Sequence, residues 1–149
     1  MKEILFRGKR VDNGEWVYGY YYESKISGCF ILVPKIKVRK KDGVVIGDSF
    51  DVFEVIPETV GQFTGLCDKN GDKIFTGDII YIKCGYGLSA FVGKGIVFFD
   101  EKRLQFRVKS VEPSSFDSEK GNTYDECDFT VIDSYEVIGN IYDNKEEEE

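Results

Sequence analysis

Any chemistry in this 149-residue chain must come from carboxylates, thiols, hydroxyls and cations, because the sequence holds no histidine. Histidine supplies the base of Ser-His-Asp and Cys-His triads and is a frequent zinc ligand. Its absence removes these triads, histidine-based proton transfer and every histidine-containing metal site. The remaining candidates are cysteine thiolates, clustered carboxylates, glycine-rich phosphate loops and basic surfaces.

The four cysteines are too far apart in sequence for a typical zinc site. Cys29, Cys67, Cys84 and Cys127 lie 38, 17 and 43 residues apart and form no Cys-x-x-Cys pair. Sites built from four thiolates generally use such close pairs. We therefore expect reduced, buried or half-buried thiols, and neither a thiolate metal site nor a disulfide scaffold.

One glycine-rich segment has the outline of a phosphate-binding loop. Five residues separate Gly87 from Gly93, where the motif requires four, and Gly95 stands where a Ser or Thr would hold Mg²⁺. No helical pattern follows the segment. The spacing therefore argues against a nucleotide site.

The segment from Asp68 to Asp72 shows the first spacings of an EF-hand loop. Lys73 then takes the position of the required glycine, and Ile79 takes that of the bidentate glutamate. A hairpin turn explains the segment better than a calcium site.

A further group of acidic residues follows residue 116. Its members are Asp117, Glu119, Asp125, Glu126 and Asp128. They could chelate a hard cation or form a carboxylate pair, but nothing in the pattern fixes their geometry, so we interpret them as solvated loop charge. The sequence thus predicts no catalytic, cofactor-binding or metal-binding residue, and we expect a protein that is not an enzyme.

The candidate interaction surface combines a basic stretch with a row of aromatic residues. Barrels that bind single-stranded nucleic acid pair cations with aromatic side chains that stack on bases. The competing interpretation, which we favour, is a basic edge strand that discourages aggregation and an aromatic row that packs in the core and across strands. The candidate residues are Tyr18, Tyr20, Tyr22, Lys35, Lys37, Arg39, Lys40 and Lys41.

Charge is distributed unevenly along the chain, whose net charge is -7. Residues 1–75 carry 12 basic and 11 acidic side chains, whereas residues 76–149 carry 8 and 16. Residues 143–149 hold five acids and one base, which predicts a solvated tail. An acidic protein binds nucleic acid poorly, because affinity for phosphate comes from cations. Setting the tail aside leaves a body close to -3, which weakens that argument.

The chain shows neither an apolar run typical of a signal peptide near its first residues nor a stretch of about 18 apolar residues. We therefore expect a soluble, cytoplasmic protein with no membrane partner.

Short alternating or apolar segments recur along the chain with turn residues between them, which is typical of a mostly β fold with antiparallel strands. Turns are expected at Asn13-Gly14, Asp42-Gly43 and Asp68 to Asp72. A loop with one short helix is expected around residues 112–128. The segment 104–109 is expected to direct Leu104, Phe106 and Val108 inward and Arg107 outward. The other expected strands are 4–9, 16–22, 30–33, 35–41, 44–46, 52–56, 78–83, 95–99, 128–132 and 135–142.

Five motifs, in this order, resemble those of the YopX family. They are Phe6–Lys9, Gly14–Gly19, Pro57–Leu66, Asp68–Ile79 and Glu136–Tyr142. The resemblance spans residues 4–142, nearly the whole chain. The family usually has a charged residue after Gly65-Leu66, whereas this chain has Cys67, which supports an incidental role for that thiol.

The YopX family belongs to phages and prophages of Gram-positive bacteria and has no established biochemical activity. The resemblance implies a mostly β fold with antiparallel sheets and a small SH3-like barrel in the C-terminal part. It supplies no catalytic or binding residues to carry over. Its glycine positions are interpreted as turns and bends: Gly61, Gly65, Gly71, Gly77 and Gly139.

The sequence therefore predicts a YopX-like β domain at 1–142, with an N-terminal hairpin part at 1–56 and an SH3-like part at 57–142, before an acidic tail at 143–149. Its expected function is that of a non-enzymatic binding or assembly module of phage origin, acting as a homo-oligomer or on a host protein. The alternative is a small β-barrel that binds single-stranded nucleic acid. An enzyme using carboxylates or Cys67 with a metal is the disfavoured hypothesis, and no cofactor is expected.

Overall fold

The structure is a computed structural model that describes residues 3–35, 39–47, 49–84, 91–111 and 126–143. The chain divides into two compact units, Met1–Phe63 and Thr64–Glu149. Described residues form β-strands and two short 3-10 helices, with no α-helix among them. The predicted mostly β fold with antiparallel sheets is confirmed. The division lies a few residues beyond the predicted boundary at 56/57, and the SH3-like character of the second part stays a prediction.

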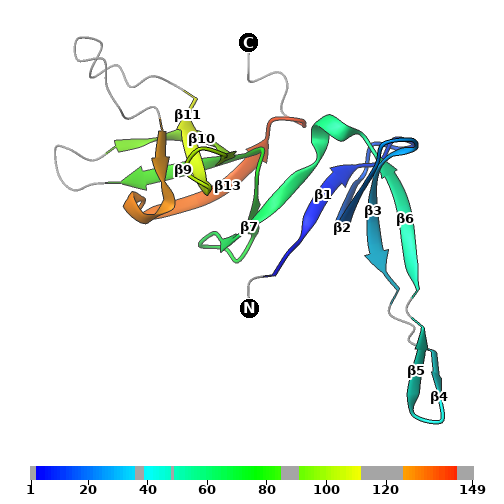
Figure 1. The fold of residues 1–149 in the computed structure, drawn as a ribbon. Helices are drawn as coiled ribbons and strands as arrows, with labels where there is room; N and C mark the ends of the chain where they lie inside the picture. Colours follow the sequence, from blue (N-terminus) through cyan, green and yellow to red (C-terminus); the bar gives the residue numbers. More distant parts are fainter. Residues whose placement is uncertain (1–2, 36–38, 48, 85–90, 112–125, 144–149) are drawn as a thin grey trace. The chain divides into compact units, whose positions relative to one another are not determined.

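The N-terminal unit is built on four antiparallel strands, which Figure 1 shows side by side. They are β1 (Phe6–Lys9), β2 (Trp16–Ser24), β3 (Gly28–Pro34) and β6 (Phe50–Val55), hydrogen-bonded in the order β6-β3-β2-β1. Between β3 and β6 the chain forms a small separate hairpin of β4 (Arg39–Lys41) and β5 (Val44–Gly47). The 3-10 helix η1 (Pro57–Thr59) follows β6, and the start of β7 (Gly61–Cys67) pairs with β1.

This sheet curls until its first and last strands meet at one end. The Val11 N–H donates to the Glu54 carbonyl at 3.0 Å, and the Ile56 N–H donates to the Lys9 carbonyl at 2.8 Å. The inner side of the curl holds a core of Cys29, Ile31 and Val55. Phe6, Val17, Tyr21, Val33 and Val60 pack against that core.

Gly19 permits the close approach of β2 and β3. A Cβ atom at this position would lie 2.2 Å from the Leu32 carbonyl oxygen, far inside van der Waals contact. Glycine in a strand often marks such a tight bend or close backbone approach. The absence of a side chain at Gly19 therefore allows the close strand approach on which the curvature of the sheet depends.

The C-terminal unit contains a five-stranded antiparallel sheet in the order β12-β11-β10-β9-β13. The strands are β9 (Asp78–Cys84), β10 (Phe91–Asp100), β11 (Gln105–Ser110), β12 (Glu126–Asp128) and β13 (Ser134–Asn140). The remainder of β7 leads through the Asp68–Asp72 turn into β8 (Lys73–Phe75). The core consists of Ile74, Ile80, Ile82, Val97, Val108 and Ile132, with Cys127, Phe129, Tyr135 and Val137 packed against it.

Three local predictions in this unit are wrong. Glu126–Asp128, expected as the end of the loop at 112–128, form β12 and pair with β11. The expected strand 128–132 is instead the 3-10 helix η3 (Phe129–Val131), because the Asp128 carboxylate accepts a hydrogen bond from the Thr130 N–H and ends β12. Leu104 is exposed rather than inward, because it lies in the turn before β11 with a φ of 54°. The expected helix near residues 114–119 lies outside the described residues.

Candidate binding surface

The outer side of the N-terminal sheet carries a row of exposed tyrosines. Side chains alternate between the two sides of a strand, so Val17, Gly19 and Tyr21 face the core while their neighbours on β2 face away. Tyr18, Tyr20 and Tyr22 are 46%, 55% and 58% exposed. The expectation that this row packs in the core is therefore wrong for these three residues. Their part in an interaction surface stays a prediction.

Neighbouring strands extend this row into a surface that we call the outer aromatic face. The strand register places Leu32 beside Tyr20 and Phe30 beside Tyr22, and then Val52 of β6 beside Leu32. The ring centres of Tyr22 and Phe30 are 6.4 Å apart, and those of Tyr20 and Phe50 are 6.5 Å apart and edge-on. The outer aromatic face comprises Trp16, Tyr18, Tyr20, Tyr22, Phe30, Leu32, Phe50 and Val52.

Sequence reasoning missed the contributions of β3 and β6 to this face. Phe50 and Val52 are both exposed. Nevertheless, the residue types of the segment 52–56 are those of an ordinary strand and do not mark any of its side chains as part of a surface. Phe50, Val52 and Glu54 occupy alternate positions and therefore share one side of β6. Only the register of β6 with β3 shows that this side continues the tyrosine row. Once the register is known, the outer positions of three strands can be read together.

Two cations lie beside the beginning of the tyrosine row. Arg7 pairs in register with Tyr18, and Lys9 pairs with Trp16. The Arg7 guanidinium carbon is 4.7 Å from the Trp16 ring centre, and the Lys9 Nζ is 5.5 Å from it. Cations over an aromatic face are held by the quadrupole of the ring. Arg7 is itself buried, so Lys9, which is partly exposed, is the more accessible of the two charges.

The basic stretch is only partly described. Lys35 is exposed and forms an ion pair of 3.3 Å with Asp51, which is also exposed. Arg39, Lys40 and Lys41 form β4, whose backbone pairs with Val44–Gly47. Lys37 lies outside the described residues. A role for these cations stays a prediction.

Inside the same sheet, Tyr21 has a different role from its neighbours. Its hydroxyl donates to the Cys29 Sγ at 3.2 Å. This hydrogen bond, together with burial, raises the pKa of Tyr21 above its ordinary value. The phenol therefore stays protonated at neutral pH and forms part of the core, along with the buried thiol.

In the C-terminal unit, the buried carboxylate of Asp68 holds a turn in place. Its Oδ1 accepts the N–H groups of Asn70 and Asp72, and its Oδ2 accepts the Val137 N–H, each at 2.9 Å. Burial tends to raise the pKa of Asp68, but the hydrogen bonds from Val137, Asp72 and Asn70 outweigh it and lower the pKa below its ordinary value. The prediction of a hairpin turn here is confirmed, and the oxygens that an EF-hand would offer to calcium bind backbone instead.

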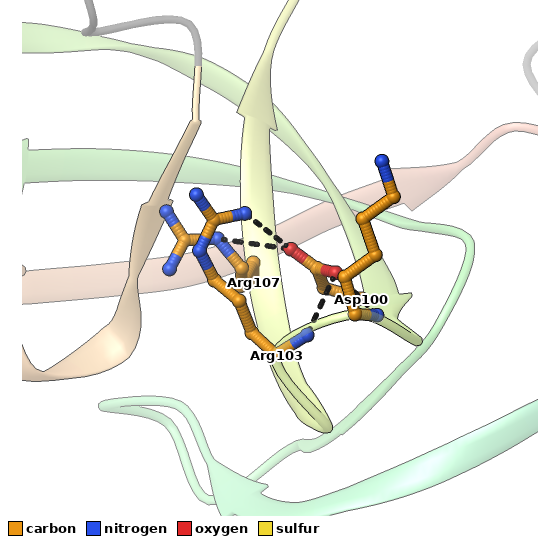
Figure 2. A network of polar contacts seen from close by, with 4 residues as sticks. Asp100, Arg103 and Arg107 are labelled. Atoms are coloured by element: carbon orange, nitrogen blue, oxygen red, sulfur yellow. Dashed lines mark hydrogen bonds and ion pairs between the residues drawn. The ribbon is translucent and has the colours of Figure 1, made fainter.

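Asp100 fixes the turn between β10 and β11, as Figure 2 shows. Its Oδ1 accepts the Lys102 N–H at 2.9 Å, and its Oδ2 lies 2.8 Å from the Arg103 Nη1 and 3.8 Å from the Arg107 Nε. The Arg103 guanidinium, with backbone hydrogen bonds, lowers the pKa of Asp100. Arg107, expected to point outward, is therefore drawn into this network.

The comparisons with known proteins agree with the motif pattern. The family model described as YopX protein matches residues 5–147. The chain belongs to the YopX family. The crystal structure of protein EF1440 from Enterococcus faecalis has a TM-score of 0.56 and 22% identity to this chain, with 100% of each chain covered. At that identity the similarity shows the fold alone. No curated protein sequence matches the chain.

Motif residues of the YopX family occupy turns in the C-terminal unit. At the β8–β9 turn, the Asp78 Oδ2 accepts the Phe75 N–H at 2.8 Å, and Gly77 has a φ of 89° that disfavours other residues. A Cβ atom on Gly77 would also lie 2.9 Å from the Tyr142 ring. These motif residues determine the geometry of a turn. Most of the outer aromatic face, in contrast, lies outside the five motifs, which include only Trp16 and Tyr18 of its residues.

None of the helices in the described part of the chain has the length and apolar character needed to span a bilayer.

Proposed function

We propose that this YopX-family protein is a phage- or prophage-derived binding and assembly module, not an enzyme, and that it binds its partner through the outer aromatic face. The observation that carries the proposal is the exposure of three successive outward tyrosines on β2. Large apolar surfaces on a soluble protein commonly mark interaction sites. Tyrosine and tryptophan also dominate the binding energy of many interfaces.

The placement of the buried carboxylates supports a non-enzymatic role. Asp68 and Asp78 accept hydrogen bonds from backbone N–H groups, and Asp100 accepts them from the following turn and pairs with Arg103. Carboxylates committed in this way stabilise turns and are poorly placed for proton transfer. The absence of histidine from the sequence supports the same conclusion.

The partner predicted from the sequence is a second copy of the chain or a host protein. Light scattering on the purified protein at several concentrations tests the first of these. If a second copy is the partner, the mass rises with concentration, and it rises less for a Tyr20→Ala/Tyr22→Ala variant. A monomer at every concentration would exclude the homo-oligomer.

Site-specific photo-crosslinking in bacterial cells tests the face without assuming the class of partner. A photoreactive phenylalanine analogue replaces Tyr20, and the matched control carries it at Tyr81, an exposed tyrosine on β9 of the other unit. We expect adducts at position 20 that disappear when Tyr18 and Tyr22 are changed to alanine, and none at position 81. Equal adducts at both positions would contradict the proposal. The mass and nuclease sensitivity of the adduct identify the partner class.

Single-stranded nucleic acid is the second candidate partner. The specific observation in its favour is that cationic Lys9 lies beside the start of the exposed tyrosine row. Rows of aromatic side chains beside cations are the usual platform for unpaired bases.

A further inference from the structure

We propose that the outer aromatic face binds single-stranded nucleic acid, with bases stacked on Tyr18, Tyr20 and Tyr22 and the phosphates drawn toward the cationic side of the row at β1. The inference rests on the proposed function, since it names the partner of the same surface. It goes against the sequence-based preference for a protein partner, and three features of the structure carry it.

The first feature is the regular spacing of exposed rings. Alternate residues of a strand are separated by about 6.6 Å along its axis. Tyr18, Tyr20 and Tyr22 therefore present rings at equal intervals on one side of β2, each at least 46% exposed. Every base has a flat face that can stack on a ring, so such a row binds an unpaired strand with little dependence on sequence.

The second feature is the separation of charge between the units. Residues 1–63 carry 10 basic and 9 acidic side chains, whereas residues 64–149 carry 10 and 18. At outward positions of β1, β2, β3 and β6, the charged residues are Arg7, Lys9 and Glu54. The acidic character of the whole protein thus comes from the C-terminal unit, and the N-terminal unit by itself has a net charge of +1. Glu54 pairs in register with Phe30 beside Tyr22, and its carbonyl accepts the Val11 N–H where the curl closes, two residues beyond Lys9.

Further basic residues follow directly on β3. Lys35 comes after Pro34, which lies two residues beyond the register partner of Tyr20 and hence toward the Tyr18 end of the row. The chain then forms β4, with Arg39, Lys40 and Lys41. Lys35 follows the alternation of the inward residues Ile31 and Val33 and is ion-paired with Asp51, so it does not add an unpaired charge to the outer face. The partly exposed cation on the same side of the sheet as the tyrosines is Lys9.

The third feature is the shape implied by the curl of the sheet. The inner side of the curl contains the core, so the outer aromatic face lies on the side away from the centre of curvature. A protein partner needs a matching concave surface to bury a convex row of rings. A flexible single strand can follow such a row, which favours nucleic acid as the occupant.

Trp16, the only tryptophan, provides the first test. It lies on the same side of β2 as the tyrosines and next to Lys9. Titration of the full chain with an oligo-dT of about 20 nucleotides should change its fluorescence at low salt. The binding constant should fall as salt rises, with a logarithmic slope of about 0.7 for each phosphate neutralised.

Variants then locate the site, with binding followed by the anisotropy of a labelled oligonucleotide. Tyr20→Ala should weaken binding roughly fivefold or more through the loss of one stacked base. Tyr20→Phe, which keeps the ring, should bind as the unmodified protein does. Tyr81→Ala, on the other unit, should have no effect. Lys9→Gln should lower the salt slope by about 0.7. Circular dichroism checks folding, and Tyr22→Ala replaces any variant that fails to fold.

The outcomes separate this inference from the proposed function. No salt-sensitive change with the oligonucleotide, or equal losses for Tyr20→Ala and Tyr81→Ala, would overturn the nucleic-acid assignment. If the oligonucleotide does not bind but position 20 still crosslinks to a second copy or another protein, the proposed function stands and this inference fails. If position 20 gives no specific adduct and no oligonucleotide binding is seen, both fail.

Discussion

The two units of this protein use aromatic and charged side chains in opposite ways. The N-terminal unit exposes a row of tyrosines and places two cations, Arg7 and Lys9, over the ring of Trp16. The C-terminal unit buries Asp68, Asp78 and Asp100, whose carboxylates accept hydrogen bonds from backbone N–H groups, mostly within turns. Buried polar groups that are fully bonded fix a structure, whereas exposed apolar groups stabilise it little. The carboxylates of the second unit therefore stabilise its turns, whereas the tyrosine row of the first unit contributes little to its core and is the surface that we propose for binding.

The largest expected effect comes from closing the gap between β2 and β3. In Gly19→Ala the new methyl group would meet the Leu32 carbonyl oxygen at 2.2 Å, and a backbone atom cannot move aside as a side-chain tip can. Overpacking of this kind should destabilise the N-terminal unit by about 3 kcal/mol or more. Urea unfolding followed by Trp16 fluorescence measures it. Unchanged stability would mean that the curl of the sheet does not depend on this glycine.

The second prediction concerns the polar interior of the C-terminal unit. Asp68→Ala leaves the Val137, Asn70 and Asp72 N–H groups without their acceptor, which should lower the free energy of unfolding by about 2–3 kcal/mol. The matched control is Asp72→Ala in the same turn, where the side chain is exposed and the cost should stay within about 0.5 kcal/mol. Urea unfolding followed by far-ultraviolet circular dichroism compares the two. Equal losses would show that burial of Asp68 is unimportant.

The third prediction is a pH dependence of stability that comes mainly from the C-terminal unit, since Asp12, whose pKa Arg10 lowers in the other unit, is largely exposed. The folded-state pKa of Asp68 lies below its ordinary value of 3.8, and that of Asp100 is also lowered. The stability these groups contribute is therefore present above about pH 4 and is lost as pH falls through their folded-state pKa values. Unfolding free energies at pH 7 and at pH 3 should differ, with the lower value at pH 3.

The matched variant for this pH dependence is Asp68→Asn, which removes the titrating group and keeps one oxygen as an acceptor. The loss of stability between the two pH values should be smaller in this variant than in the unmodified protein. An identical loss in both would assign the acid sensitivity to other carboxylates.

Sequence reasoning found most strands and turns because their signals are local. Asn13-Gly14, Asp42-Gly43 and the Asp68 turn all connect paired strands, as expected from their residue types. The prediction of a strand at 128–132 was wrong because it relied on the apolar residues of this segment and did not consider Asp128 as the cap of a 3-10 helix. That carboxylate bonds the backbone two residues on, which is a local competitor to strand pairing.

The candidate surface was harder to predict, because both sides of β2 are apolar. Alternation separates Trp16, Tyr18, Tyr20 and Tyr22 from the intervening residues but does not say which set faces the core. The larger aromatic set suggested burial, yet the inner set is the one that contains Gly19, where β3 approaches closely. Long-range pairing, which brings β6 and β1 together around that side, decides the question.

The smallest expected effect on stability is also the sharpest test of the comparison between the units. Tyr20 is 55% exposed, so Tyr20→Ala removes little buried surface and should change the free energy of unfolding by no more than about 0.5 kcal/mol. Urea unfolding followed by Trp16 fluorescence checks this value. A loss of several kcal/mol would show that the row of tyrosines is part of the folding core. A small loss of stability, together with a loss of crosslinking from Tyr18 or Tyr22, would mean that the row serves binding. Exposed rings that do not stabilise the fold are expected at interaction sites.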